Sequence, residues 1–262
     1  MRVLGGWLYS AKHAFFSLLF SRWMILLALV AFFPPLLSEL IVLFGPKTPT
    51  LKQYLTMLGL PVLQLAVPFP ALFLGVAVLG EEIDGRTLTY LFTRPLPRSV
   101  HYLGRLFGFV GAYGVILGVG VLGVAFVFRS AVPLDTVQVL GSVAIAVGGL
   151  LVYAAFFALL RALLRRALFI GFLITFITEV AISKMPVSGL SACSIWHHLA
   201  LLELRLLDLQ TTRIALFRGI SPSETATTSL VVLGCILGVS LLAGIWIVQR
   251  REFRLPAAVA AG

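Results

Sequence analysis

Long apolar runs separated by short charged segments make up most of the chain. Flanking charges mark off the runs at residues 23–44, 60–79, 106–128, 137–160, 167–182 and 230–248. A helix needs about 20 consecutive apolar residues to cross the hydrocarbon core of a bilayer. The pattern therefore predicts an all-α integral membrane protein with six transmembrane helices. The fifth run is the shortest and contains Glu179, so the pattern defines its outer boundary least sharply.

Composition agrees with this membrane assignment. Of the 262 residues, 60% are hydrophobic and only 11% are charged, whereas soluble domains carry about 25% charged residues. The polar segments between the runs are too short to bury a core of their own, and the longest is the connection at 184–229. We therefore expect a single transmembrane domain over residues 1–262. Two cysteines do not make a disulfide framework, and we expect no bridge between Cys193 and Cys235.

Basic residues indicate how the runs are oriented. If the N-terminus is inside, most of the 20 lysines and arginines fall in the segments that face the cytoplasm. The positive-inside rule then places both termini in the cytoplasm. The net charge of +10 is explained by topology and contact with anionic lipid, so we do not expect nucleic-acid binding.

Residues 1–22 precede the first apolar run and have an amphipathic pattern. Trp7, Leu8, Ala11, Phe15 and similar residues recur at helical spacing, opposite a more polar face. This pattern is typical of a helix that lies on the inner surface of the membrane. The alternative is that these residues simply extend the first transmembrane helix into the cytoplasm.

Residues 80–105, GEEIDGRTLTYLFTRPLPRSVHYLGR, are a dense polar insertion between the second and third runs. Acidic residues come first and arginines follow, an order that suits the dipole of a helix. Leu88, Leu91 and Phe92 fall on one face at i, i+3 and i+4 spacing, and Pro95 ends the pattern. The segment predicts a short amphipathic helix on the cytoplasmic membrane surface, where a soluble partner can reach it.

The same segment resembles the cytoplasmic loop of the ABC type-2 transporter permease family. The resemblance lies in Glu82, Gly85-Arg86-Thr87, Tyr90-Leu91, Arg94-Pro95, Arg98 and Leu103-Gly104-Arg105. The predicted layout is also similar to that family, with six spans, both ends inside and an N-terminal interfacial helix. The resemblance implies a permease subunit of the bacterial cytoplasmic (inner) membrane that pairs with a second permease copy to form an export pathway. It also implies a separate cytoplasmic ABC ATPase, in two copies, that carries ATP and Mg.

In that family the loop supplies a coupling helix that docks on the ATPase. The resemblance implies this coupling role for Glu82, Gly85, Arg86, Leu88, Tyr90, Leu91, Arg94, Pro95 and Arg98. The second inner loop offers Arg165 and Arg166 as a further contact, or as charges that serve topology alone. We expect no ATP hydrolysis on this chain, because a phosphate-binding loop of the form G-x-x-x-x-G-K-[ST] is absent from its sequence.

Two acidic residues fall within the predicted spans. A charge near the bilayer centre costs about 2.5–3.5 kcal/mol on insertion scales, so Glu39 and Glu179 call for an explanation. Either one or both line a polar cavity or bind substrate cations, or each pairs with a nearby base or backbone group, as Glu179 can with Lys184.

A metal site is not expected at Cys193 and His197-His198. Adjacent histidines on a helix point about 100° apart, which suits one ion poorly, and H-E-x-x-H is absent from the sequence. Trp196, His197 and His198 are instead predicted at the outer membrane interface, where aromatic side chains gather. Residues 199–210 are predicted to form an interfacial helix after them.

Glycine and proline indicate how the helices pack. Pairs four residues apart, such as Gly104 with Gly108 and Gly234 with Gly238, allow close helix approach within one chain or across a dimer. Prolines within the first two runs predict bent or broken helices there.

The sequence leaves two functions open besides that of a transport subunit. A non-transporting anchor or assembly factor for a soluble partner would use the same inner loop. An intramembrane enzyme is a weaker alternative, because G-x-S-x-G and zinc motifs are absent from the sequence.

Overall fold

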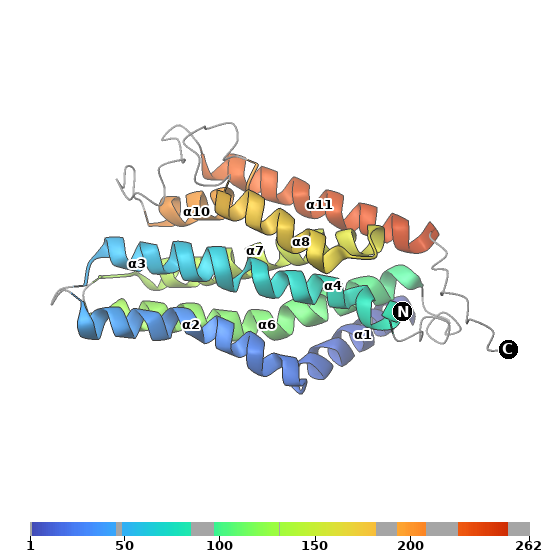
Figure 1. Ribbon diagram of the computed structural model, residues 1–262, viewed down its shortest axis with the longest axis horizontal. Coiled ribbons are helices and arrows are strands. Elements are labelled where there is room, and N and C mark those ends of the chain that lie inside the picture. The colour runs from blue at the N-terminus through green and yellow to red at the C-terminus, as the bar shows by residue number, and fades with distance from the viewer. Residues whose placement is uncertain are drawn as a thin grey trace.

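A computed structural model describes residues 2–45, 49–84, 97–130, 132–181, 193–207 and 225–250. The residues that it describes form helices, with no strand among them (Figure 1). Five stretches are long and apolar enough to cross a membrane: Arg22–Phe44, Leu51–Gly80, Arg98–Phe128, Thr136–Leu163 and Ala226–Arg250. Ala167–Glu179 is a shorter apolar helix. The prediction of an all-α, multi-pass membrane protein is therefore confirmed.

Helices α6 (Arg98–Phe128) and α7 (Thr136–Leu163) form the centre of the bundle. Helix α1 (Arg2–Leu19) packs on the first half of α6, and α2 (Arg22–Phe44) packs on its second half. Helix α4 (Pro68–Asp84) packs on both central helices. On the other side, α8 (Ala167–Thr175), α10 (Ile195–Leu206) and α11 (Ala226–Arg250) contact α7 (Figure 1).

Close packing of α1 on α6 depends on two glycines. A Cβ atom at Gly104 would lie 2.7 Å from the Cβ atom of Ser10. A Cβ atom at Gly108 would collide with the backbone of Ala11 and lie 2.7 Å from the Cβ atom of Ala14. This glycine pair therefore serves packing within the chain, one of the two roles that the sequence left open.

Proline changes the second helical stretch more than the first. Helix α2 continues through Pro34 and Pro35. The second stretch starts as α3 (Leu51–Met57), passes through the π-helix η1 (Leu58–Ala66) around Pro61, and continues as α4. A second π-helix, η2 (Phe176–Ala181), follows α8. Wide turns of this kind are rare and are found mostly as short bulges, frequently at functional sites.

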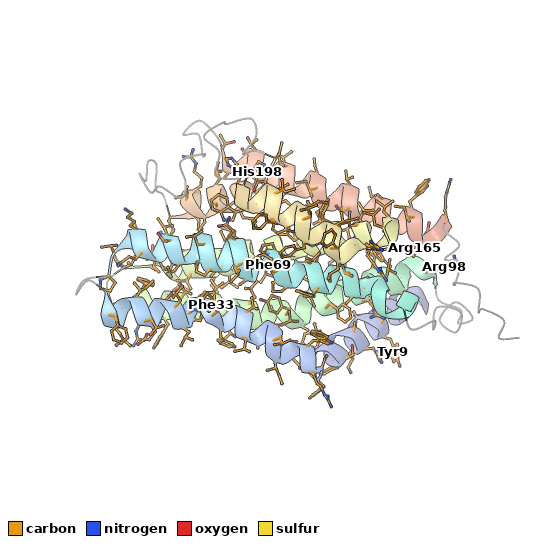
Figure 2. All side chains as sticks on the ribbon, in the orientation of Figure 1. Tyr9, Phe33, Phe69, Arg98, Arg165 and His198 are labelled. Atoms are coloured by element: carbon orange, nitrogen blue, oxygen red, sulfur yellow. The ribbon has the colours of Figure 1, made fainter. Side chains whose placement is uncertain are left out.

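Several helix ends meet at one end of the bundle. The start of α1, the end of α4, the start of α6, the junction of α7 with α8 and the end of α11 all lie there (Figure 1). Arg98 and Arg165 are both at this end, whereas His198 is at the opposite one (Figure 2). We call these the inner end and the outer end, after the orientation that the basic residues predict.

Candidate functional site

The inner end contains the two helix ends that flank the charged residues of the segment 80–105. Helix α4 ends at Asp84 and α6 begins at Arg98, whose side chain is partly buried. Among the predicted coupling residues, Glu82 lies in the last turn of α4, and its side chain is outside the described part. Those from Gly85 to Pro95 lie outside the described residues altogether: Gly85, Arg86, Leu88, Tyr90, Leu91, Arg94 and Pro95.

Two arginines from neighbouring helices hold the last turns of α4. Arg105 of α6 donates from Nη2 to the carbonyl oxygen of Ala77 at 3.3 Å, and its guanidinium lies over the ring of Phe109. The buried Arg161 of α7 lies against Gly80, where an added Cβ would be 3.6 Å from Nε. Positive charge at the C-terminal end of a helix is stabilised by the helix dipole. The second half of α4 thus contacts both central helices.

Arg161 also fixes the turn between α7 and α8. Its Nη1 donates to the carbonyl oxygen of Arg165 at 2.6 Å. The side chains of Arg165 and Arg166 are exposed, so they are available to a partner. From the sequence, Arg161 belonged to the second inner loop, interpreted as a further contact or as topology charge, and no signal in the pattern separated it from the two exposed arginines.

Helix α1 is tied to the same end of the bundle. The Ser10 hydroxyl lies 3.2 Å from Nδ1 of His101, near the start of α6. Trp7 of α1 and Phe107 of α6 also pack edge to face. Helix α1 is therefore in direct contact with the first turns of α6.

The outer half of the bundle holds a buried polar cluster around Glu179. Its carboxylate accepts hydrogen bonds from the Ser194 hydroxyl at 2.5 Å and from the backbone amides of Trp196 and Ile195 at 3.0 and 3.3 Å. Thr178 donates to the same carboxylate at 3.4 Å. These partners lie at the N-terminal end of α10, where a helix favours negative charge. Glu179 thus caps α10 from a different helix.

Two further bonds connect this cluster to the π-helix η1. Gln64 Nε2 donates to the carbonyl oxygen of Glu179 at 2.6 Å, and the indole of Trp196 donates to the carbonyl oxygen of Gly59 at 2.9 Å. The cluster therefore joins η1, η2 and α10. Lys184, which the sequence offered as a partner for Glu179, lies outside the described residues, so that pairing stays a prediction.

A second buried carboxyl lies on α10 itself. Glu203 accepts a short hydrogen bond from the Ser142 hydroxyl on α7, and Tyr54 of α3 lies near the pair. Burial raises the pKa of the Glu203 carboxyl to about 7, against the opposing effect of the Ser142 hydrogen bond. The sequence had assigned Glu203 to a surface helix and missed its burial.

Helix α10 was predicted to lie at the outer membrane interface, and its position relative to the membrane stays a prediction. Trp196, His197 and His198 are buried inside the protein rather than exposed on its surface, as are Leu199, Leu201 and Leu204 after them. The His198 ring lies 3.1 Å from the Ser229 hydroxyl at the start of α11. Among the described residues, no group of three or more His, Cys, Asp or Glu side chains could hold a metal ion.

Glu39 and Glu179 are in different surroundings. Glu39 is exposed near the end of α2, whereas Glu179 is 3% exposed. The two acids therefore do not share one polar lining.

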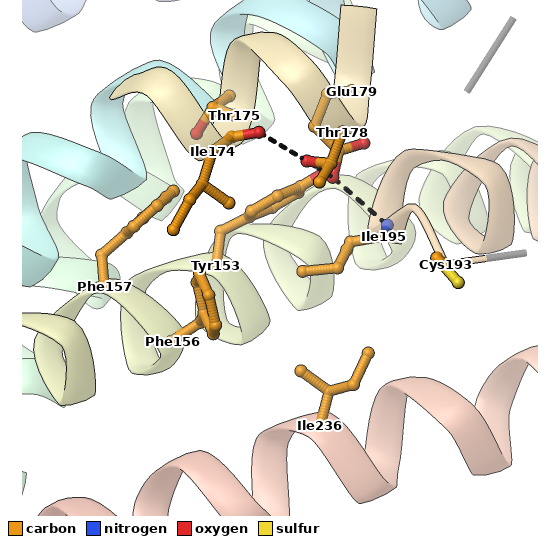
Figure 3. Close-up of a pocket in the computed structure, with 10 residues that line it drawn as sticks. All are labelled: Tyr153, Phe156, Phe157, Ile174, Thr175, Thr178, Glu179, Cys193, Ile195 and Ile236. Carbon is orange, nitrogen blue, oxygen red and sulfur yellow. Dashed lines mark hydrogen bonds between the residues drawn. The ribbon is translucent and has the colours of Figure 1, made fainter. Parts of the chain in front are cut away.

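A cavity of about 170 Å³ lies beside Glu179 (Figure 3). Helix α7 contributes Tyr153, Phe156 and Phe157 to its wall. The stretch from α8 to η2 and the segment leading into α10 complete one side, and Ile236 of α11 faces them.

Compared with models of known protein families and with curated protein sequences, the chain shows no significant match.

Proposed function

We propose that this chain is the membrane-spanning permease subunit of an ABC transporter in the bacterial inner membrane. In this proposal it exports a substrate and works with a second permease copy. Two copies of a separate ATP-binding subunit bind and hydrolyse ATP with Mg. Two features support this proposal: the motif at 80–105 and the bundle of apolar helices.

The topology in this proposal has six crossings. The short helix Ala167–Glu179 would be the fifth, and both termini would be cytoplasmic. The position of the start of α1 and the end of α11 at the same end of the bundle supports this arrangement (Figure 1).

One observation carries the proposal: the helices on either side of the charged segment are firmly anchored. Arg105 and Arg161 hold the last turns of α4 against α6 and α7. Ser10 and the glycine contacts hold α1 against the first turns of α6. A load applied at the end of α4 or at the start of α6 would therefore reach four helices.

ATP can drive such a bundle only through a difference in affinity between two shapes. The ATP-bound partner must bind one conformation of the permease more tightly than the other. The coupling residues Glu82, Arg94 and Arg98 are proposed to supply this difference, with Arg165 and Arg166 as a second contact.

The second copy is proposed to pack on the outside of the bundle. Helix α11 has a glycine pair, Gly234 and Gly238, where an added Cβ would meet no atom within 4 Å. Most of α2 and α11 is not covered by the rest of the chain. Both helices therefore have faces on which a second copy could pack.

The test uses the chain purified in mild detergent from its own cells and photolabelled with an azido derivative of ATP. We expect the label on a separate polypeptide that co-purifies with the chain. Exchanging the charges with Glu82→Lys and Arg94→Glu should reduce its recovery about tenfold, equivalent to about 1.4 kcal/mol. A matched control, Glu39→Lys with Lys52→Glu, also leaves the net charge unchanged and should have no effect. Label on the chain itself, or a partner retained by the first double variant, would contradict the proposal.

A further inference from the structure

The face of α1 that points away from the bundle carries an open groove. Ser10, Ala14 and Leu18, on the opposite face of this helix, are buried against the rest of the protein. Figure 2 shows Tyr9 on the outside of the bundle, toward the inner end. The groove measures about 520 Å³ and is lined by Tyr9, Lys12, His13, Phe16, Ser17 and Phe20.

Most polar groups of the groove are not used by the protein itself. Among the described residues, no carboxylate pairs with the Lys12 ammonium group, and neither the Tyr9 hydroxyl nor the His13 ring makes a hydrogen bond. The rings of Tyr9 and His13 lie side by side, with their centroids 6.3 Å apart. Only the Ser17 hydroxyl is engaged, donating to the carbonyl oxygen of Ala14 at 3.0 Å.

The charge of the groove has one sign. Helix α1 contains no acidic residue, and neither does α6, the helix on which it packs. Arg22, exposed at the start of α2, adds a second positive charge near the end of the groove. The groove is therefore complementary to an anion that accepts hydrogen bonds.

Aromatic rings form the other half of the groove, toward α2. Phe16 and Phe20 are stacked with their centroids 6.4 Å apart, and Phe20 is 84% exposed. The exposed apolar surface continues onto the first turns of α2 at Trp23 and Leu26. The polar groups and the apolar groups thus follow one another along the chain, as they do along an amphiphile.

The corner between α1 and α2 lies where the hydrocarbon of a membrane would end. Helix α2 is apolar enough to cross a membrane, and its 23 residues make it about 35 Å long, close to the thickness of the hydrocarbon core. Helix α1 leaves this corner at an angle to α2 (Figure 1). The rings of Phe16 and Phe20 are therefore next to the hydrocarbon, and Tyr9, Lys12 and His13 are at the level of the lipid headgroups.

We propose that this groove binds an anionic glycerophospholipid of the leaflet at the inner end. Its phosphate group would contact Lys12 and Tyr9, and its acyl chains would run along Phe16 and Phe20. A zwitterionic phospholipid suits the groove less well, because its ammonium group meets positive charge and no carboxylate of α1. The proposal goes beyond the proposed function. Lipid binding requires no ATPase and no transport, so the two proposals can fail independently.

Native mass spectrometry of the full chain tests the proposal. The chain is purified in mild detergent, freed of lipid, and titrated with dioleoylphosphatidylglycerol or with dioleoylphosphatidylethanolamine, which has the same acyl chains. The Kd of the first bound lipid is measured for each. We expect phosphatidylglycerol to bind about fivefold more tightly, the contribution of about one basic residue beside an anionic lipid surface.

Three variants locate the site. Lys12→Gln should weaken the binding of phosphatidylglycerol about fivefold and leave that of phosphatidylethanolamine unchanged, whereas Lys12→Arg should keep the preference. Lys52→Gln removes the same charge at the outer end and should change neither Kd. All three replace exposed side chains, so their melting temperatures without lipid should equal that of the wild type.

Four results would overturn the proposal. Equal affinities of the wild type for the two lipids would show that the headgroup charge is not recognised. An unchanged affinity in Lys12→Gln would place the lipid elsewhere. An equal loss in Lys52→Gln would reduce the effect to the overall charge of the chain. Release of phosphatidylglycerol by inorganic phosphate would assign the groove to a soluble anion instead of a lipid.

Discussion

The hydroxyl of Tyr113 donates a hydrogen bond to the carbonyl oxygen of Ala66 at 2.9 Å. Ala66 is four residues before Pro70, which has no backbone N–H to complete the helical bond to that carbonyl. A tyrosine on α6 thus satisfies a backbone acceptor that proline leaves unpaired in the adjoining helix. Both residues are buried.

Removing this hydroxyl should destabilise the bundle. Tyr113→Phe leaves the Ala66 carbonyl buried without its side-chain donor, and we expect a loss of about 1–3 kcal/mol in the free energy of unfolding. Thermal unfolding in detergent measures the change. Tyr9→Phe, on the exposed face of α1, is the matched control and should have little effect. Equal melting temperatures for the two variants would show that the hydrogen bond contributes nothing.

The two glycine pairs should respond differently to a large side chain. Gly108→Leu would force α1 away from α6, and overpacking of this kind costs about 1–3 kcal/mol. Gly238→Leu meets no atom of its own chain within reach of a Cβ, so the stability of one copy should not change. Unfolding experiments and the oligomeric state in detergent distinguish the two effects.

If α11 packs on a second copy, Gly238→Leu should weaken the dimer while Gly108→Leu leaves it assembled. A dimer that survives Gly238→Leu unchanged would exclude this face from the contact.

Stability should depend on pH through Glu203. Its pKa in the folded protein is about 7, above the ordinary 4.5, so between these values the folded state binds the proton more tightly than the unfolded chain. Stability therefore falls as pH rises from about 4.5 to about 7, by about 3 kcal/mol in total, and changes little above that range.

Glu203→Gln carries no titrating group and should flatten this part of the profile. Melting temperatures measured from pH 5 to pH 8 test the prediction, with the exposed Glu39→Gln as control. Parallel profiles for the wild type and Glu203→Gln would assign the pH dependence to other groups.

The main helices could be predicted from sequence because hydrocarbon crossing requires long apolar runs. The run at 23–44 corresponds to α2 almost residue for residue, since Ser21 and Gly45 flank it. Helix α6 begins earlier than predicted, at Arg98, because its first turns pack on α1 through Gly104 and carry Arg105 to the end of α4. Periodicity in one segment does not reveal such a partner.

The burial of α10 could not be predicted from the pattern of its own residues. Its histidines and Glu203 look like surface residues, yet the contacts that bury them come from α7, α11 and η1. Glu179 caps α10 from a position 17 residues before Trp196 in the chain. The pattern did not define where the fifth run ends, so it could not predict this contact. The coupling residues from Gly85 to Pro95 remain a prediction.

The central claim is that the charged segment at 80–105 contacts an ATP-binding partner. A photocrosslinking amino acid, p-benzoylphenylalanine, is placed at Arg94 in the full chain, and the same residue at Lys52, at the outer end, is the control. After irradiation in native membranes, the crosslinked product is tested for labelling by an azido derivative of ATP. The proposal predicts an ATP-labelled product from position 94 and none from position 52. A crosslink from position 94 only to lipid or to polypeptides that carry no ATP label would contradict it.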